Sequence, residues 1–279
     1  MVVGNVDNYQ LSGKVMEKTS TSYVNIIEAT PRNTAAAIAF SAFASEPNDI
    51  LVITPSDHII DQMENYNQAI NEAFAKANDG FIVTFGVIPT KPETGYGYIE
   101  AEGDNVISFR EKPNETTAKE FIAKGNFLWN SGMFCFKASV LLEELKKFQP
   151  DVYEKSKAVW EASKEGFLDL ALSMEIPSIS IDYAVMERSK KIKVVPASFS
   201  WSDLGSFESV YDYLFSKGHP TDSEGNMVIG CNKHTTFLGL KNTIFVYTET
   251  ANLILQKENS QDVKDIYNEL EKQNSDLLN

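Results

Sequence analysis

The first half of the chain alternates short apolar runs with amphipathic stretches, and this alternation restricts the fold more than any other feature. Strand-like and helix-like segments alternate in the order Val24–Ile27, Asn33–Ala44, Ile50–Thr54, Glu64–Ala77 and Phe81–Phe85. Strand, helix, strand, helix, strand is the pattern of a parallel sheet covered by helices. The runs around Ile26 and Val52 are apolar without alternation, which predicts central strands buried on both faces.

The rest of the chain adds antiparallel strands and a small C-terminal region. Between Tyr98 and Phe136 we expect an antiparallel insertion on the same sheet, with strands at Tyr98–Glu102, Val106–Glu111 and Met133–Phe136 around a helix at Thr117–Ala123. Helices are predicted at Ala138–Lys147, Val152–Ser163 and Ile181–Arg188, before a strand at Lys193–Val195. After the turn residues Gly218–Pro220, a β-rich appendage is predicted from apolar runs at Met227–Ile229, Ile244–Val246 and Leu253–Leu255, closed by a polar helix at Gln261–Lys272. We therefore predict an α/β protein with a main domain at 1–217 and a small domain at 218–279.

Charge and cysteine content exclude several functional classes. The net charge of −14 gives a surface that repels nucleic-acid phosphates. The two cysteines, Cys135 and Cys231, form no Cys-x-x-Cys pair, so neither a disulfide scaffold nor a zinc site is indicated, and a cytoplasmic location fits best. No apolar run approaches the roughly 18 residues that a membrane span needs, so we expect no membrane association.

Two aspartates are candidates for a magnesium site. Asp57 follows a predicted buried strand, and Asp203 also follows a strand and precedes a helix, so their two loops could meet at one metal ion. Magnesium prefers one or two carboxylates together with substrate phosphates. The alternative for Asp57 is a local turn bond or a cap on the next helix.

Three other segments could contact a ligand. Glu111 offers a hydrogen-bond acceptor beside the Lys112 cation, which could bind sugar hydroxyls and a phosphate, or the pair could be a solvated strand end. Gly97 lies between two tyrosines, where a ligand could approach the backbone closely, although a tight turn would need the same residues. Asn130 could present its amide to a hydroxyl or could occupy a turn.

Glu28 ends the first predicted strand and could recognise a base. Guanine presents adjacent N1 and N2 donors, and one carboxylate can accept from both. The alternative is an ion pair between Glu28 and Arg32.

Several short motifs, taken together and in order, resemble bacterial mannose-1-phosphate guanylyltransferases. They are Thr30-Pro31-Arg32-Asn33-Thr34-Ala35, Pro55-Ser56-Asp57-His58, Gly95-Tyr96-Gly97-Tyr98-Ile99, Glu111-Lys112-Pro113, Asn130-Ser131-Gly132, Ile181-Asp182-Tyr183 and Trp201-Ser202-Asp203-Leu204-Gly205. The resemblance implies a Rossmann-like mixed sheet of the nucleotide-diphospho-sugar transferase type. It also implies that GTP and mannose 1-phosphate give GDP-mannose and pyrophosphate.

The same resemblance implies roles for individual residues. It places Mg²⁺ at Asp57 and Asp203 and Lys112 near the phosphates, and these three residues are the predicted catalytic set. The implied guanine contacts are Glu28, Asn33 and Thr34, and the implied sugar contacts are Gly97, Glu111 and Asn130. Asp182 is expected among the substrate-binding residues without a specific role.

One part of the family pattern is not found in the printed residues. The family opens with a strand and a glycine-rich loop that holds the triphosphate, whereas Met1-Val2-Val3-Gly4 resembles the family's second strand. Two hypotheses follow: an enzyme of GDP-mannose synthesis, or a non-catalytic remnant that binds sugar nucleotide or a partner subunit. Asp57, Glu111, Lys112 and Asp203 favour the enzyme, because a binding remnant has no need for both metal carboxylates. A related enzyme using another sugar 1-phosphate, and a homo-oligomer, stay open.

Overall fold

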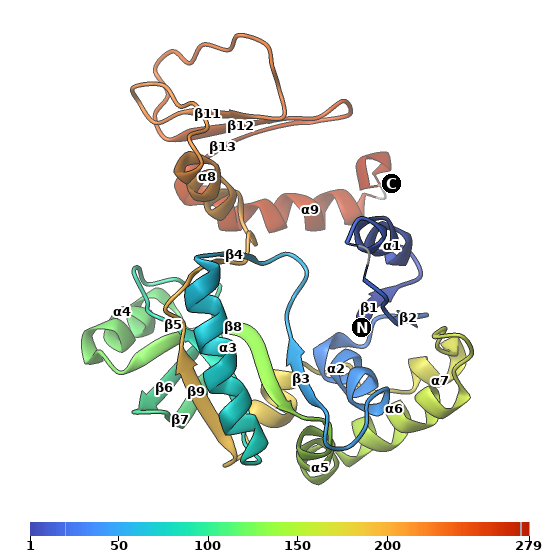
Figure 1. Cartoon of the computed structure of the whole chain (residues 1–279). Coiled ribbons are helices and arrows are strands. Elements are labelled where there is room, and N and C mark those ends of the chain that lie inside the picture. Colours follow the sequence, from blue (N-terminus) through green and yellow to red (C-terminus); the bar gives the residue numbers. More distant parts are fainter. Residues whose placement is uncertain (20, 274, 279) are drawn as a thin grey trace. The chain divides into compact units, whose positions relative to one another are not determined.

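The computed structural model describes residues 1–19, 21–273 and 275–278. The chain forms two compact units that interleave in sequence (Figure 1). The larger unit comprises Met1–Pro55 and Gln62–Phe199, and the smaller unit comprises Ser56–Asp61 and Ser200–Asn279. This division differs from the one at 217/218, because residues 200–217 and a short excursion at 56–61 belong with the C-terminal region.

A six-stranded mixed sheet forms the centre of the larger unit, in the order β3-β8-β5-β9-β7-β6. Its strands are β3 (Ile50–Ile53), β5 (Ile82–Val87), β6 (Tyr98–Glu102), β7 (Asn105–Arg110), β8 (Phe127–Lys137) and β9 (Ile192–Pro196). β5 and β9 run parallel, whereas β6 pairs antiparallel with both β7 and β8. The predicted antiparallel insertion on the same sheet is confirmed.

The two strands expected at the centre of the sheet do not lie there. β2 (Asn25–Glu28) pairs in parallel with β1 (Val2–Asn5) in a separate two-stranded sheet, and β3 ends the order of the large sheet. On its other side β2 contacts the segment at 166–168, where the Ile27 N–H donates to the Gly166 carbonyl at 2.8 Å. Ile26 is nevertheless fully buried. An apolar run reports burial of both faces, but it does not report which backbone groups occupy the strand's edges.

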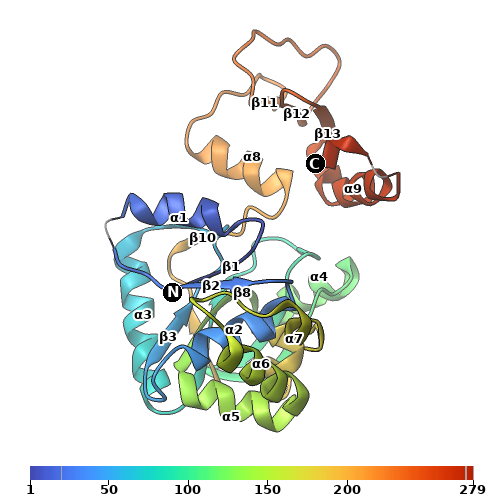
Figure 2. The same cartoon turned by 90° about the vertical axis from the view of Figure 1, so that its right-hand side faces the viewer.

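The helices of the larger unit pack against each other and against the strands. α2 (Asn33–Phe43) packs against α5 (Ala138–Phe148) and α6 (Pro150–Ala162), and the three helices lie side by side in both views (Figure 1, Figure 2). Ala35, Ala36 and Ala39 of α2 are fully buried, which allows close helix packing. α3 (Met63–Asn78) packs on β5, β8 and β9. The remaining helices of this unit are α1 (Tyr9–Glu17), α4 (Glu115–Lys124), α7 (Leu170–Met174) and the π-helix η1 (Asp182–Met186).

The smaller unit contains two sheets and a separate core. β4 (Ile59–Asp61) pairs antiparallel with β10 (Ser200–Ser202). The predicted C-terminal strands form a three-stranded sheet of β11 (Met227–Ile229), β12 (Thr243–Tyr247) and β13 (Asn252–Gln256). The helices are α8 (Phe207–Ser216), η2 (Lys257–Asp262), α9 (Val263–Lys272) and η3 (Asp276–Leu278). The core cluster consists of Tyr211, Met227, Ile244 and Leu255.

Both cysteines are free. Among the described residues, no helix is long and apolar enough to cross a membrane.

Candidate functional site

Three neighbouring strands of the larger unit bring Gly97, Glu111 and Asn130 to one level. β6 pairs with β7 on one side, with Tyr98 opposite Arg110, and with β8 on the other, with Tyr98 opposite Trp129. Gly97 precedes Tyr98, whereas Glu111 and Asn130 follow Arg110 and Trp129. Because both pairings are antiparallel, Gly97 therefore lies between Glu111 and Asn130. The Asn130 N–H donates to the Gly97 carbonyl at 2.8 Å. The alternative that Asn130 occupies a turn is wrong, because this residue lies inside the long strand β8.

Gly97 leaves room for the side chain of its neighbour Glu111. A Cβ atom at Gly97 would lie 2.6 Å from Glu111 Oε2, which is closer than real Cβ contacts. The missing side chain makes room for the Glu111 carboxylate in the middle of the row.

A π-helical turn brings a second carboxylate to the row. The Asn130 Nδ2 donates to Asp182 Oδ1 at 2.8 Å, and Asp182 is the first residue of η1. Burial raises the pKa of Asp182, although the hydrogen bond from Asn130 lowers it in part. Burial also raises the pKa of Glu111, and the nearby Asp182 charge adds to that rise. Each of these two acids therefore holds its proton more tightly than an exposed carboxyl group does.

Lys112 supplies a positive charge to the same row. Its Nζ lies 3.7 Å from Glu111 Oε1, and its side chain is exposed. Its backbone has a φ of 41°, in the left-handed region that non-glycine residues rarely adopt. The exposed ammonium can reach a phosphate as a point charge.

Glu28 is a buried carboxylate with an unused acceptor. It is 8% exposed, and its Oε1 has no hydrogen-bond partner. Burial raises the pKa of Glu28 from 4.5 to about 7, against a lowering contribution from the Arg32 backbone N–H. The alternative ion pair with Arg32 is wrong, because the Arg32 Nε donates to the Ile176 carbonyl at 2.6 Å.

The side chains of the two residues after Arg32 accept hydrogen bonds from backbone N–H groups. Asn33 has a φ of 67°, and its Oδ1 accepts from the Thr34 N–H at 2.8 Å. The Thr34 Oγ1 accepts from the Ile181 N–H at 2.9 Å. Thr34 thereby ties the start of α2 to the residue that precedes Asp182.

In the smaller unit, Asp57 and Asp203 come to the same end of one strand pair. Ile59 of β4 pairs with Ser202 of β10, so Asp57 lies two residues before the ladder and Asp203 one residue after it. The Trp201 Nε1–H donates to His58 Nδ1 at 3.2 Å, which makes His58 a support for this end of the ladder. Burial lowers the pKa of His58, against the raising effect of the Asp57 and Asp203 charges. The alternative that Asp57 caps the next helix is wrong, because a strand follows it.

These carboxylates fit a magnesium ion that substrate phosphates would help to hold. The exposed Asp57 carboxylate makes no hydrogen bond or ion pair to any residue that the structure describes. Asp203 Oδ1 accepts from the Gly205 N–H at 3.1 Å. No cluster of three or more metal-binding side chains occurs in the described ranges. Two carboxylates are a donor set that Mg²⁺ accepts when it binds together with a nucleotide.

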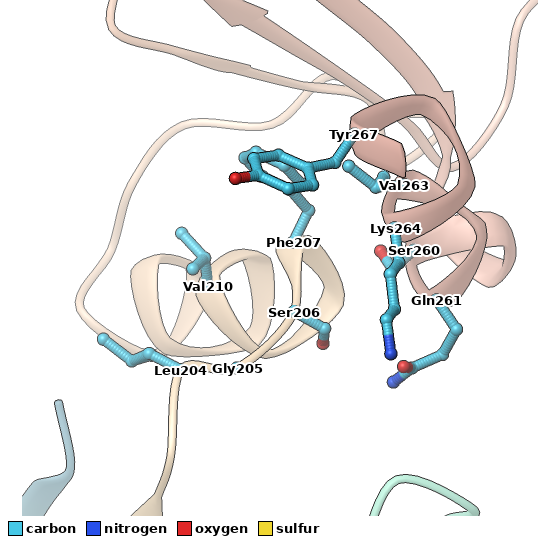
Figure 3. Close-up of a pocket in the computed structure, with 10 residues that line it drawn as sticks. All are labelled: Leu204, Gly205, Ser206, Phe207, Val210, Ser260, Gln261, Val263, Lys264 and Tyr267. Atoms are coloured by element: carbon cyan, nitrogen blue, oxygen red, sulfur yellow. The ribbon is translucent and has the colours of Figure 1, made fainter. Parts of the chain in front are cut away.

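One pocket was not predicted from the sequence. Its lining begins at Leu204, the residue after Asp203. Its volume is about 460 Å³, and its lining residues are Leu204, Gly205, Ser206, Phe207, Val210, Ser260, Gln261, Val263, Lys264 and Tyr267. Figure 3 shows Lys264 and Gln261 extending in the same direction, away from the ring of Tyr267. The polar helix predicted here gave no sign of the pocket, because the lining combines helices that are distant from each other in the chain.

Thr84 was also missed. Its Oγ1 donates to Asn130 Oδ1 at 3.2 Å from the neighbouring strand β5. A threonine in the apolar run Ile82–Phe85 is the one available signal, since a fully buried hydroxyl needs a partner.

Comparison with known proteins identifies the family of the chain. A family model described as Nucleotidyl transferase matches residues 6–216. The chain is 39% identical over 277 residues to the alginate biosynthesis protein AlgA of Pseudomonas aeruginosa, covering 89% of this chain and 56% of AlgA. It is also 39% identical to mannose-1-phosphate guanylyltransferase 2 of Escherichia coli O157:H7, covering 86% of this chain and 56% of that protein. The chain thus spans about half the length of these curated relatives.

Two crystal structures resemble the fold. One is described as mannose-1-phosphate geranyltransferase from Thermus thermophilus, with a TM-score of 0.79, 27% identity, and coverage of 96% of this chain and 84% of that one. The other is described as mannose-6-phosphate isomerase from Helicobacter pylori, with a TM-score of 0.69, 39% identity, and coverage of 72% of this chain and 83% of that one.

Proposed function

The chain belongs to the nucleotidyl transferase family, and on that premise we propose that it transfers a guanylyl group from GTP to mannose 1-phosphate. The products are GDP-mannose and pyrophosphate. The proposal includes a cytoplasmic location, which two thiols without a disulfide fit. The name of the relative from E. coli O157:H7 supports both the base and the sugar.

The observation that carries the choice of base is the unused acceptor of Glu28. A buried carboxylate oxygen without a partner is costly, and a ligand that donates to it recovers the lost hydrogen bond. Guanine can donate N1–H and N2–H to one carboxylate side by side. Adenine has no such pair of donors.

Substrate positioning supplies most of the chemistry. An oxygen of the sugar phosphate attacks the α-phosphorus of GTP in line. The bond between the α-phosphorus and the oxygen that bridges it to the β-phosphorus breaks, and pyrophosphate leaves with that electron pair. Glu111 and Asn130 orient the sugar hydroxyls, and the Lys112 ammonium neutralises phosphate charge. No protein nucleophile takes part, so the reaction depends on orientation and charge neutralisation.

Asp57 and Asp203 are the residues that would hold Mg²⁺. When bound, the ion stabilises negative charge on the phosphate oxygens, a contribution of several kcal/mol in metal-dependent enzymes.

Base selectivity tests the proposal at Glu28. The comparison uses GTP and ITP, which lacks the guanine N2 amine, with wild type and Glu28→Gln. In the wild type we expect GTP to be preferred about tenfold or more, since one charged hydrogen bond is at stake. In Glu28→Gln the preference should shrink, because the amide presents an uncharged oxygen and an NH₂ group that repels the guanine donors. An unchanged ratio would remove Glu28 from the base site.

A further inference from the structure

The side-chain amide of Asn130 has only one orientation that satisfies its neighbours. Its Oδ1 accepts from the Gly132 N–H at 3.2 Å, and it is the nearer acceptor for the single Thr84 hydroxyl hydrogen, at 3.2 Å against 3.5 Å to the Met133 carbonyl. Its Nδ2 donates to Asp182 Oδ1 at 2.8 Å. Exchanging the two amide atoms would set an NH₂ group against the Gly132 N–H and an oxygen against the Asp182 carboxylate. Both contacts would be repulsive, so the orientation is fixed from two sides.

Asp182 is held in place by the backbone around it. The N–H of the preceding residue, Ile181, donates to Thr34 Oγ1, and η1 begins at Asp182 with a π-helical turn. Such turns often occur at functional sites, because they set one side chain in a direction that a regular helix would not allow. Here the direction is toward Asn130 on β8.

The hydrogen-bond count at Asn130 determines what it can offer a ligand. Oδ1 already accepts two hydrogen bonds, and one of the two Nδ2 hydrogens points to Asp182. The second Nδ2 hydrogen has no partner among the described residues. Asn130 therefore has a donor left and no acceptor, whereas the Glu111 carboxylate, one strand beyond Gly97, offers acceptor oxygens.

We propose that Asp182 is a positioning residue that makes Asn130 a hydrogen-bond donor toward the sugar, opposite the acceptor Glu111. The inference rests on the proposed sugar 1-phosphate site and deepens it. A sugar must then place an oxygen that accepts at Asn130 and a hydroxyl that donates at Glu111. The polarity of this pair, set by Asp182, selects among sugars that differ in hydroxyl positions.

Kinetics on the full-length protein separate positioning from simple structural support. Asp182→Ala removes the acceptor, and we expect KM for mannose 1-phosphate to rise about tenfold, with KM for GTP and kcat nearly unchanged. Asp182→Asn keeps the shape and can still accept through its amide oxygen, so its KM should lie between those of wild type and Asp182→Ala. The matched control is Glu187→Gln, because Glu187 is an exposed acid just after η1 and makes no hydrogen bond to Asn130. A comparable rise of KM in Glu187→Gln would overturn the proposal, since loss of charge alone would then explain the effect.

Monodeoxy analogues of mannose 1-phosphate provide the readout that a structural role would not move. We expect one analogue, lacking the hydroxyl that meets Asn130, to have the same KM in wild type and Asp182→Ala. A variant that weakens all analogues by the same factor would contradict positioning and indicate a general disturbance of the fold.

The side-chain NMR signal of Asn130 tests the orientation without any sugar. In ¹⁵N-labelled protein, the two Nδ2–H resonances of Asn130 should have clearly different proton chemical shifts, and this difference should become smaller in Asp182→Ala. The Asn130→Ala variant lacks both resonances and thereby assigns them. Unaltered resonances in Asp182→Ala would refute the proposed contact. If the wild type does not bind mannose 1-phosphate but the Asn130 resonances still change in Asp182→Ala, the proposed function is refuted and the proposed orientation of Asn130 still holds.

Discussion

The burial of Glu28 lowers the stability of the folded protein, and in the proposed function the same buried carboxylate binds the base. A carboxylate that is 8% exposed and has an unpartnered oxygen is easier to bury protonated than ionised. Its pKa of about 7, against 4.5 for the ordinary group, expresses that preference. The folded state therefore holds the proton more tightly than the unfolded chain, and the stability of the protein falls as the pH rises through that window.

Glu28→Gln should remove this dependence. The variant carries no charge at any pH, so we expect it to be more stable than wild type at pH 8, by up to about 3 kcal/mol from the size of the pKa rise. The difference should shrink as the pH falls from 7 toward 4.5. Urea unfolding at pH 5 and pH 8 measures it. Equal stabilities at pH 8 would mean that Glu28 is not held in a buried, uncompensated position.

Gly97→Ala probes the room that the glycine leaves for Glu111. The new Cβ would meet the Glu111 carboxylate, which is the flexible end of a side chain, so the fold should tolerate the change. We expect a small loss of stability, about 1 kcal/mol or less, and a clear rise in KM for the sugar phosphate because the carboxylate moves. Thermal unfolding and steady-state kinetics measure the two effects. A large stability loss with unchanged KM would place the importance of Gly97 in folding instead.

At the scale of elements, a bulge in β8 sets the position of Asn130, because one residue of β5 lies opposite three residues of β8. The pairing of β5 with β8 shifts between Thr84 and Gly86, so that Gly86 lies opposite Asn130. A Cβ at Gly86 would lie 2.5 Å from Leu128 Cδ1 and 2.8 Å from Val194 Cγ2. The strands on both sides of β5 therefore leave no room for a side chain at this position.

Gly86→Ala should be costly for that reason. We expect a loss of about 1–3 kcal/mol in the free energy of unfolding, typical of overpacking. The double variant Gly86→Ala/Leu128→Ala removes the nearest contact and should cost less than the sum of the two single variants. Additive losses in urea unfolding would show that the Leu128 contact does not limit this position.

The β4–β10 ladder carries the two carboxylates proposed for magnesium. Asp57→Asn and Asp203→Asn should each lower kcat by a factor of about a hundred or more, because a catalytic metal contributes several kcal/mol. Both should also weaken Mn²⁺ binding in the presence of GTP, measured by electron paramagnetic resonance. Asp265→Asn, an exposed acid on α9 in the same unit, is the control and should change neither quantity. Normal Mn²⁺ binding in both ladder variants would contradict the assignment.

The sequence predicted the bounds of helices and strands better than it predicted which strands pair with each other. β6 agrees with the expected Tyr98–Glu102, and α2, α3 and α5 lie within one or two residues of their predicted bounds, because hydrophobic periodicity is local. The central placement of β2 and β3 was wrong, because hydrogen-bond partners are not written in a strand's own residues. The strand expected before Asp203 is confirmed as β10, whereas β4 and the π-helical form of η1 were missed, because a three-residue strand pairs across a long stretch of chain and a π-turn has the periodicity of an ordinary helix.

The candidate site divides in the same way. Motifs in order singled out Gly97, Glu111, Asn130 and Asp182, and the structure brings these four together in the larger unit. Thr84 could not be predicted from its own surroundings, because its role arises from the strand beside it. The pocket next to Asp203 likewise needs two distant helices.

At the scale of the whole molecule, each unit carries its own set of polar groups. The larger unit holds Glu28 and the row of Gly97, Glu111 and Asn130, whereas the smaller unit holds Asp57 and Asp203. The excursion at Ser56–Asp61 explains why: it adds Asp57 to a unit built mainly from the C-terminal residues. The net charge of −14 makes local cations such as Lys112 important for any phosphate-bearing substrate.

Product formation tests the central claim most directly. The full-length protein is mixed with Mg²⁺, one nucleoside triphosphate and one sugar 1-phosphate, and both pyrophosphate and the nucleotide sugar are quantified, the latter by mass spectrometry. The account predicts equal amounts of pyrophosphate and GDP-mannose from GTP and mannose 1-phosphate, and far less product from ATP. Faster turnover with another sugar 1-phosphate would contradict the proposed sugar. Binding of GDP-mannose without any release of pyrophosphate would contradict the proposed catalysis and favour a protein that only binds sugar nucleotide.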